Sequence, residues 1–69
     1  MTFPERLLAL RKKKGVLQQD IAQAVGISKH SYQRLEYGER EPRLPVLISL
    51  ADYYGITLDE LVGRNLESE

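Results

Sequence analysis

A group of basic and amide side chains lies near the middle of the chain, within residues 26–38. Lys29, His30, Gln33 and Arg34 fall within six positions of one another there. All four can donate hydrogen bonds, and lysine and glutamine also match the hydrogen-bonding edges of guanine and adenine. Side chains of these types at this spacing favour contacts with the bases and phosphates of nucleic acid.

The charge of the chain is unevenly distributed along the sequence. Ten Lys and Arg residues balance ten Asp and Glu residues, so the net charge is zero. Residues 1–34 hold seven bases against two acids, a net +5, whereas residues 35–69 hold three bases against eight acids, a net −5. Such a distribution can attract phosphate to one part of the surface and repel it from another.

The chain lacks the residue combinations that catalysis and metal binding require. It has no cysteine, and its single histidine, His30, has no second ligand at a suitable spacing, so no metal site is expected. Asp59 and Glu60 are explained as acids in the first turn of a helix rather than as a catalytic pair. With no activated nucleophile and no phosphate-binding loop, we expect a protein that is not an enzyme and needs no cofactor or small-molecule ligand.

Size and composition indicate one small globular domain. Sixty-nine residues, 42% of them apolar and 29% charged, are enough for a single compact core. The longest uninterrupted apolar run, residues 7–10, is far too short to span a membrane, and no basic start leads into an apolar segment of the signal type. We therefore expect no membrane association and a cytoplasmic location.

Hydrophobic spacing, helix caps and glycines predict five helices and no strand. Thr2 with Glu5, and Thr57 with Glu60, form the pattern of a capping box at two helix starts. The expected helices cover residues 3–13, 18–25, 29–37, 44–54 and 58–62. This pattern predicts an all-α domain over residues 1–63, followed by a short tail over residues 64–69.

The second and third expected helices are separated only by Gly26, Ile27 and Ser28, which is the spacing of a helix-turn-helix unit. On a helical wheel, Tyr32 and Leu35 lie on the buried side of the third helix. The opposite side carries His30, Gln33, Arg34 and Tyr37. The sequence thus predicts a helix that packs on one side and offers hydrogen-bond donors on the other.

The run QQDIAQAVGISKHSYQRLEYG resembles the phage repressor and Cro-like (XRE-type) helix-turn-helix family. Outside this run, LLALRKKKG resembles the family's first helix and REPRLPVLISLADYYGITLDELVG its fourth and fifth. The resemblance implies a five-helix, lambda-repressor-like DNA-binding domain with the helix-turn-helix at helices 2 and 3. It further implies a transcriptional regulator, usually a repressor, that binds a palindromic double-stranded DNA operator as a homodimer.

The resemblance also implies roles for individual residues. Lys29 and Gln33 are the leading base contacts, and His30 beside them would reach a base or a phosphate. Arg11 and Glu36 match a pair that orients the first helix against the third. The candidate contacts with the DNA backbone are Gln18, Ser28, Arg34, Arg40 and Arg43. Of these, Arg43 could instead enter a narrow minor groove.

Four positions depart from the family pattern. Leu17 and Arg43 stand where threonine or serine usually caps the second and fourth helices, although Asp20 can partly replace the first cap electrostatically. Glu39 and Glu41 flank Arg40. Because these two acids repel phosphate, we expect a modest affinity for DNA per domain.

A second interpretation is an interaction module, such as an antitoxin or a bridging factor, whose main partner is a protein. Ile48 supports it, because the wheel of the fourth helix places this apolar residue in water. We expect the dimer contact around residues 56–62 and the flank of the fourth helix.

Overall fold

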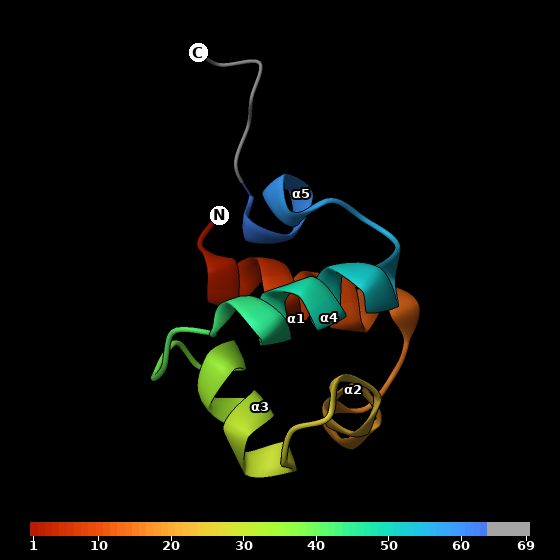
Figure 1. Ribbon diagram of the computed structural model, residues 1–69, viewed down its shortest axis with the longest axis vertical. Helices are drawn as coiled ribbons and strands as arrows, with labels where there is room; N and C mark the ends of the chain where they lie inside the picture. The colour runs from red at the N-terminus through yellow and green to blue at the C-terminus, as the bar shows by residue number, and fades with distance from the viewer. Residues whose placement is uncertain (64–69) are drawn as a thin grey trace.

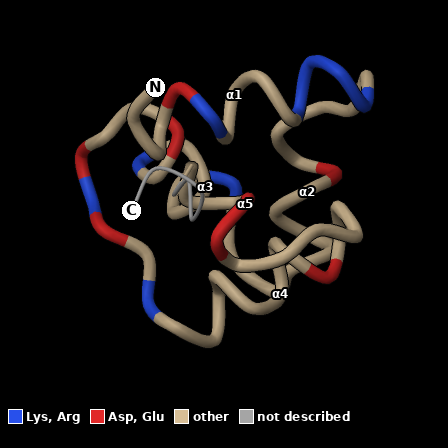
Figure 2. The backbone as a smooth tube through the Cα atoms, turned by 90° about the horizontal axis from the view of Figure 1, so that it is seen from above, with Lys and Arg blue, Asp and Glu red and all other residues tan. Residues whose placement is uncertain are grey.

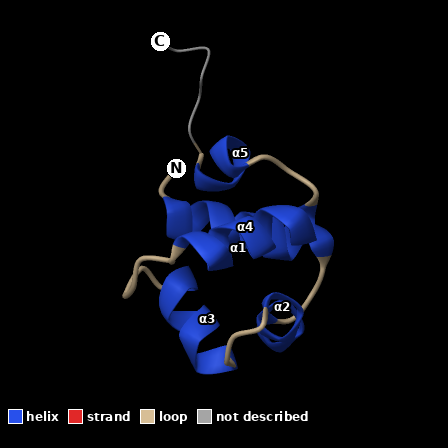
Figure 3. Cartoon of the chain, in the orientation of Figure 1, coloured by secondary structure: helices blue, strands red, loops and turns tan. Residues whose placement is uncertain are grey.

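Five α-helices follow one another in the computed structural model, which describes residues 1–63, and these residues contain no strand (Figure 3). Their bounds are α1 Phe3–Lys14, α2 Gln18–Val25, α3 Lys29–Glu36, α4 Leu44–Tyr54 and α5 Leu58–Val62. The all-α, five-helix prediction is confirmed. Compared with the predicted bounds, α1 is one residue longer and α3 is one residue shorter, because Tyr37 is its C-cap. The tail predicted over residues 64–69 lies outside the described residues.

Side-chain caps hold the starts of α1 and α5. The Thr2 hydroxyl accepts the Glu5 N–H at 3.4 Å, and the Glu5 carboxylate accepts the Thr2 N–H at 2.9 Å. Thr57 and Glu60 repeat this exchange at 3.0 and 2.9 Å. The backbone hydrogen bonds lower the pKa of both carboxylates below the ordinary value. Both predicted capping boxes are present.

The starts of α2 and α4 lack such caps. Leu17 and Arg43 occupy the N-cap positions and accept no hydrogen bond through a side chain. At α2 the Asp20 carboxylate instead accepts the Leu17 N–H at 3.0 Å. Asp20 therefore compensates for part of the missing cap with a direct hydrogen bond, in addition to the electrostatic effect expected from the sequence.

The core receives one fully buried side chain from each helix. Leu7, Ile21, Tyr32, Leu50 and Leu61 each have 0% exposure. Burying apolar area of this kind is the main driving force for folding a chain this short. In Figure 1, α2 and α3 lie on one side of α1 and α4, whereas α5 lies on the other. Among these helices, α3 packs against α1 and α2, so its orientation is set by the rest of the domain.

The turn between α2 and α3 is short and hydrogen-bonded. Gly26 has φ 79°, a left-handed conformation that glycine adopts without steric cost. The Ile27 N–H donates to the Ala22 carbonyl at 2.9 Å, and the Ser28 hydroxyl accepts the Ser31 N–H at 3.0 Å. Ala22 is 2% exposed, consistent with the close approach of the two helices. These features together form the predicted helix-turn-helix.

None of the helices within residues 1–63 is both long enough and apolar enough to cross a bilayer.

Candidate nucleic-acid interface

The two sides of α3 differ in what they contact. Tyr32 and Leu35 are buried, with 0% and 4% exposure, as the helical wheel predicted. On the opposite side Lys29, His30 and Arg34 are exposed. Within residues 1–63, none of these three side chains forms a hydrogen bond or an ion pair (the hydrogen bonds of α3 come from other side chains). Their donors are therefore available to a partner.

Gln33 lies between these two sides. It is half-buried, and its Nε2 donates to Gln18 Oε1 at 3.0 Å. Gln18, the first residue of α2, in turn donates from Nε2 to Glu36 Oε1 at 3.0 Å. Gln33 was predicted to contact a base and Gln18 to contact a phosphate. The hydrogen bond between the two side chains was not predicted from the sequence.

The structure places Arg11 and Glu36 in a two-bond ion pair. Arg11 Nε donates to Glu36 Oε2 at 2.8 Å, and Arg11 Nη2 donates to Glu36 Oε1 at 3.0 Å. The third nitrogen, Nη1, donates to the Val16 carbonyl at 3.2 Å. Arg11 thereby ties the last turn of α1 both to the α1–α2 turn and to the end of α3. Planar two-bond geometry of this kind fixes orientation as well as adding attraction.

Glu36 is a buried acceptor with four donors around it. Its side chain is 2% exposed, and besides Arg11 and Gln18 it accepts the Tyr32 hydroxyl at 2.7 Å. Burial by itself would raise the pKa of Glu36, but hydrogen bonds from Arg11, Tyr32 and Gln18 outweigh it and hold the pKa below its ordinary value of 4.5. Burial raises the pKa of the Tyr32 hydroxyl, so this group stays a donor. Glu36 is therefore ionised at neutral pH.

The remaining phosphate candidates lie at two separate places. Ser28 is exposed at the start of α3, where its hydroxyl already caps the helix. Arg40 and Arg43 are exposed in the loop between α3 and α4. Figure 2 shows this loop as an alternation of acidic and basic residues, because Glu39 and Glu41 flank Arg40. Both loop arginines border a hollow with Ile27 and Ser31, whereas Lys29 lines other hollows.

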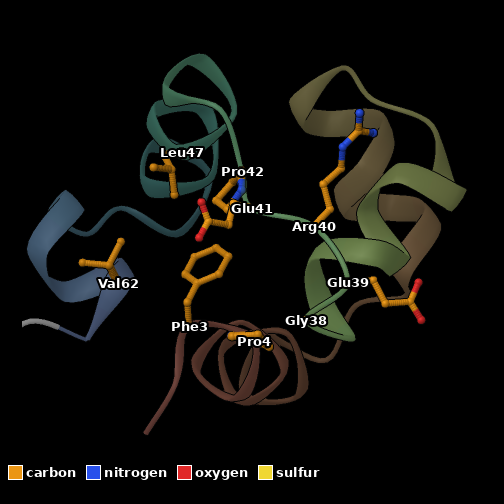
Figure 4. Close-up of a pocket in the computed structure, with 9 residues that line it drawn as sticks. All are labelled: Phe3, Pro4, Gly38, Glu39, Arg40, Glu41, Pro42, Leu47 and Val62. Atoms are coloured by element: carbon orange, nitrogen blue, oxygen red, sulfur yellow. The ribbon is translucent and has the colours of Figure 1, made fainter.

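A hollow of about 500 Å³ lies beside the same loop. Phe3, Leu47 and Val62 contribute apolar side chains to it, and the Glu41 carboxylate lies near Phe3 (Figure 4). Arg40 points away from these side chains and also borders a second hollow beside Ile27 and Leu35. The first hollow combines apolar walls with acidic loop residues, so its chemistry does not suit phosphate.

Leu17 and Tyr37 are two exposed residues beside Gln18 that were not named as candidate site residues from the sequence. Their exposures are 69% and 60%, and they line one shallow hollow together with Lys29. The Tyr37 hydroxyl lies 3.5 Å from Gln18 Nε2. The exposure of Tyr37 was indicated by the helical wheel, which placed this residue on the outer side of the helix with His30. For Leu17 the only signal in the sequence was the missing cap at the start of α2.

No three His, Cys, Asp or Glu side chains in the described part of the chain lie close enough together to hold an ion.

A helix-turn-helix family model matches residues 7–61, so the chain belongs to the helix-turn-helix family. The relatives that it matches are transcriptional regulators and phage repressors, which are not enzymes. The resemblance to the phage repressor and Cro-like group that the sequence showed is confirmed.

Two curated relatives illustrate the similarity. The chain is 43% identical over 65 residues to the transcriptional regulator AnsR of Bacillus subtilis, covering 94% of this chain and 56% of AnsR. It is 41% identical over 64 residues to the cryptic phage CTXphi transcriptional repressor RstR of Vibrio cholerae, covering 93% of this chain and 57% of RstR. The chain thus spans a little over half the length of these relatives.

Solved structures share the fold. A transcriptional regulator from Listeria innocua superposes with a TM-score of 0.87 and 33% identity, over 93% of this chain and 60% of that one. The P22 c2 repressor, in a crystal structure with a synthetic operator, superposes with a TM-score of 0.87 and 28% identity, over 94% of this chain and 98% of the repressor chain.

Proposed function

We propose that this chain is a sequence-specific double-stranded DNA-binding transcriptional regulator that acts as a repressor. In this proposal α3 enters the major groove, where Lys29, His30 and Gln33 contact base edges. Gln18, Ser28, Arg34, Arg40 and Arg43 contact the DNA backbone. The regulated DNA would lie in the cytoplasm, and so would the protein.

One observation carries the proposal: α3 is locked into the domain on one side and keeps its donors free on the other. Tyr32 and Leu35 pack into the core, whereas Lys29, His30 and Arg34 are exposed and bond to nothing else in residues 1–63. A helix held in this way can present donors to a groove without losing its own packing. The likeness to the P22 c2 repressor, whose structure holds an operator, supports the same use of α3.

The proposal includes a homodimer on a palindromic operator. A single small module buries little surface on DNA, and two-fold symmetry doubles its contacts. Exposed apolar side chains on α4 and α5 offer a surface for the dimer: Ile48 is 44%, Leu58 40% and Val62 37% exposed. Sedimentation at micromolar concentration, with and without DNA, checks this part. A strictly monomeric mass in both cases would count against it.

The same apolar side chains favour a second candidate function, a module whose main partner is a protein, such as an antitoxin. The two candidates differ in which surface matters. If DNA recognition is the function, replacing both Lys29 and Gln33 by Ala abolishes operator binding. If a protein partner is the function, the double variant leaves partner binding unchanged.

Selection of bound duplexes from a random DNA pool tests the proposed function directly. We expect enrichment of a short palindromic sequence, with affinity that falls steeply as salt increases, because each neutralised phosphate releases counterions. Absence of any enriched sequence would refute sequence recognition. A flat response to salt would refute the phosphate contacts.

A further inference from the structure

We propose that Glu36 and Gln18 are positioning residues that fix which end of the Gln33 amide meets DNA, and that Gln33 is thereby set to select adenine over guanine. This inference rests on the proposed function and adds a specific base preference to it. It concerns three side chains in one line of hydrogen bonds, from the domain interior to the outer side of α3.

The line begins at a group that can only accept. Glu36 is ionised and buried, with Arg11 bound to both of its oxygens and the Tyr32 hydroxyl bound to Oε2. An ionised carboxylate has no hydrogen to donate. Gln18 lies 3.0 Å from Oε1, so it must present its NH2 group to Glu36 rather than its oxygen.

The orientation of the Gln18 amide in turn sets the orientation of the Gln33 amide. Since the NH2 group of Gln18 faces Glu36, its Oε1 faces α3, where it accepts from Gln33 Nε2 at 3.0 Å. The oxygen and nitrogen of a glutamine amide have nearly the same shape, so only their neighbours decide the orientation. Turning both amides over would place the Gln18 oxygen against the carboxylate of Glu36, with two acceptors facing each other.

Gln33 keeps one N–H donor and one oxygen acceptor that can contact DNA. One of its two N–H donors is bound to Gln18, which leaves one N–H and the Oε1 acceptor. Adenine presents one acceptor, N7, and one donor, N6–H, in the major groove, and this pair matches the free half of the amide. Guanine presents two acceptors there, O6 and N7, so the Gln33 oxygen would face an acceptor.

The test replaces Gln18 with Met, which keeps the length of the side chain and removes the amide. Random-pool DNA selection is run on the wild-type protein, on Gln18→Met and on Gln23→Met, with Gln33→Ala used to locate the base that Gln33 reads. Gln23 is the matched control, because it is an exposed glutamine of the same helix outside the hydrogen-bond line. Gln18→Ala serves as a second variant if Gln18→Met folds poorly.

We expect the wild-type protein and Gln23→Met to prefer adenine at that base by about tenfold, the size of a good two-bond contact. Gln18→Met should reduce the preference to about twofold, because both N–H donors of Gln33 become free to meet guanine. In the free proteins, side-chain amide NMR should show an ordered Gln33 NH2 group in the wild type and a mobile one in Gln18→Met. Backbone spectra should otherwise agree.

Two results would overturn the inference while leaving the proposed function in place. In the first, Gln18→Met retains the full preference for adenine. In the second, Gln18→Met weakens binding to every sequence equally, which is the behaviour of a phosphate contact alone. A wild-type protein that selects no sequence at all would instead refute the proposed function, and the base preference with it.

Discussion

The two sides of α3 show how one short helix serves both stability and recognition. On the inner side, Tyr32 and Glu36 are buried, and their polar atoms are hydrogen-bonded. On the outer side, Lys29 and Arg34 are exposed and bond to nothing else in residues 1–63. Buried polar groups are costly unless they are paired, whereas exposed donors are satisfied by water until a partner displaces it. The inner side therefore determines where the outer side is held.

This comparison predicts that changes on the inner side affect folding, whereas changes on the outer side affect binding. Gln33 is the exception, since it is half-buried and reaches Glu36 through Gln18. A change at Gln18 or Gln33 should leave the fold intact and alter which DNA is bound.

The largest effect is expected from Arg11→Met. The substitution leaves Glu36 buried without its charged partner, and losing one member of a buried pair costs about 3–5 kcal/mol. Chemical denaturation should show a destabilisation of that size. The double variant Arg11→Met with Glu36→Gln removes the buried charge and keeps an acceptor for Tyr32, so it should recover more than half of the loss. Equal stability of the single and double variants would argue against a charge effect.

A smaller effect is expected from removing the buried hydroxyl of Tyr32. Tyr32→Phe loses a hydrogen bond to a charged group, worth about 1.5–3 kcal/mol, and should lower the free energy of unfolding by that amount. Tyr54→Phe is the matched control, because the Tyr54 hydroxyl is buried with no hydrogen-bond partner among the described residues. Removing the Tyr54 hydroxyl should leave the free energy of unfolding unchanged or raise it. If thermal denaturation shows the same loss of stability for both variants, the hydrogen bond from Tyr32 to Glu36 does not account for the destabilisation.

On the outer side, Lys29→Ala should leave folding nearly unchanged, within about 0.5 kcal/mol, as is usual for exposed positions. Its affinity for the selected operator should fall by about 1–3 kcal/mol, and discrimination at one base should relax. Fluorescence titration and thermal denaturation measure the two quantities on the same sample. Lys13→Ala, on the exposed end of α1, is the control for a general loss of charge. If Lys13→Ala has the same effect, the role of Lys29 is electrostatic and not base-specific.

The smallest effect near neutral pH is expected from titration of the inner side. The pKa of Glu36 is lowered in the folded state, so its contribution to stability is present above its ordinary value of 4.5. That contribution is lost as the pH falls below 4.5 and passes through the lowered pKa. Between pH 8 and pH 5 stability should therefore change little on account of this group. Denaturation curves of the wild type and Glu36→Gln should converge only in acid, and convergence above pH 5 would contradict the assignment.

Much of the fold was predictable because the signals are local. Thr2, Thr57 and the glycines after the helices mark starts and ends through contacts within a few residues. The wheel of α3 placed Tyr32 and Leu35 inward, because side-chain direction follows from helical periodicity alone. The observed bounds differ from the predicted ones by one residue at α1 and at α3.

The contacts of the site were less predictable because they join distant parts of the chain. Arg11 and Glu36 are 25 positions apart, and their pairing came from the family resemblance and not from periodicity. Gln18 and Gln33 were each assigned to DNA. A wheel gives the direction of a side chain within its own helix but not its distance to the next helix, so their mutual bond was missed.

Amide chemical-shift mapping during titration with the selected duplex tests the central claim most directly, because it reports on every part of the domain at once. The account predicts that the largest changes occur at Lys29, His30, Gln33 and Arg34 and at the start of α2, and that the core position Leu50 stays unchanged. Changes concentrated on α4 and α5, with the outer side of α3 unaffected, would contradict it.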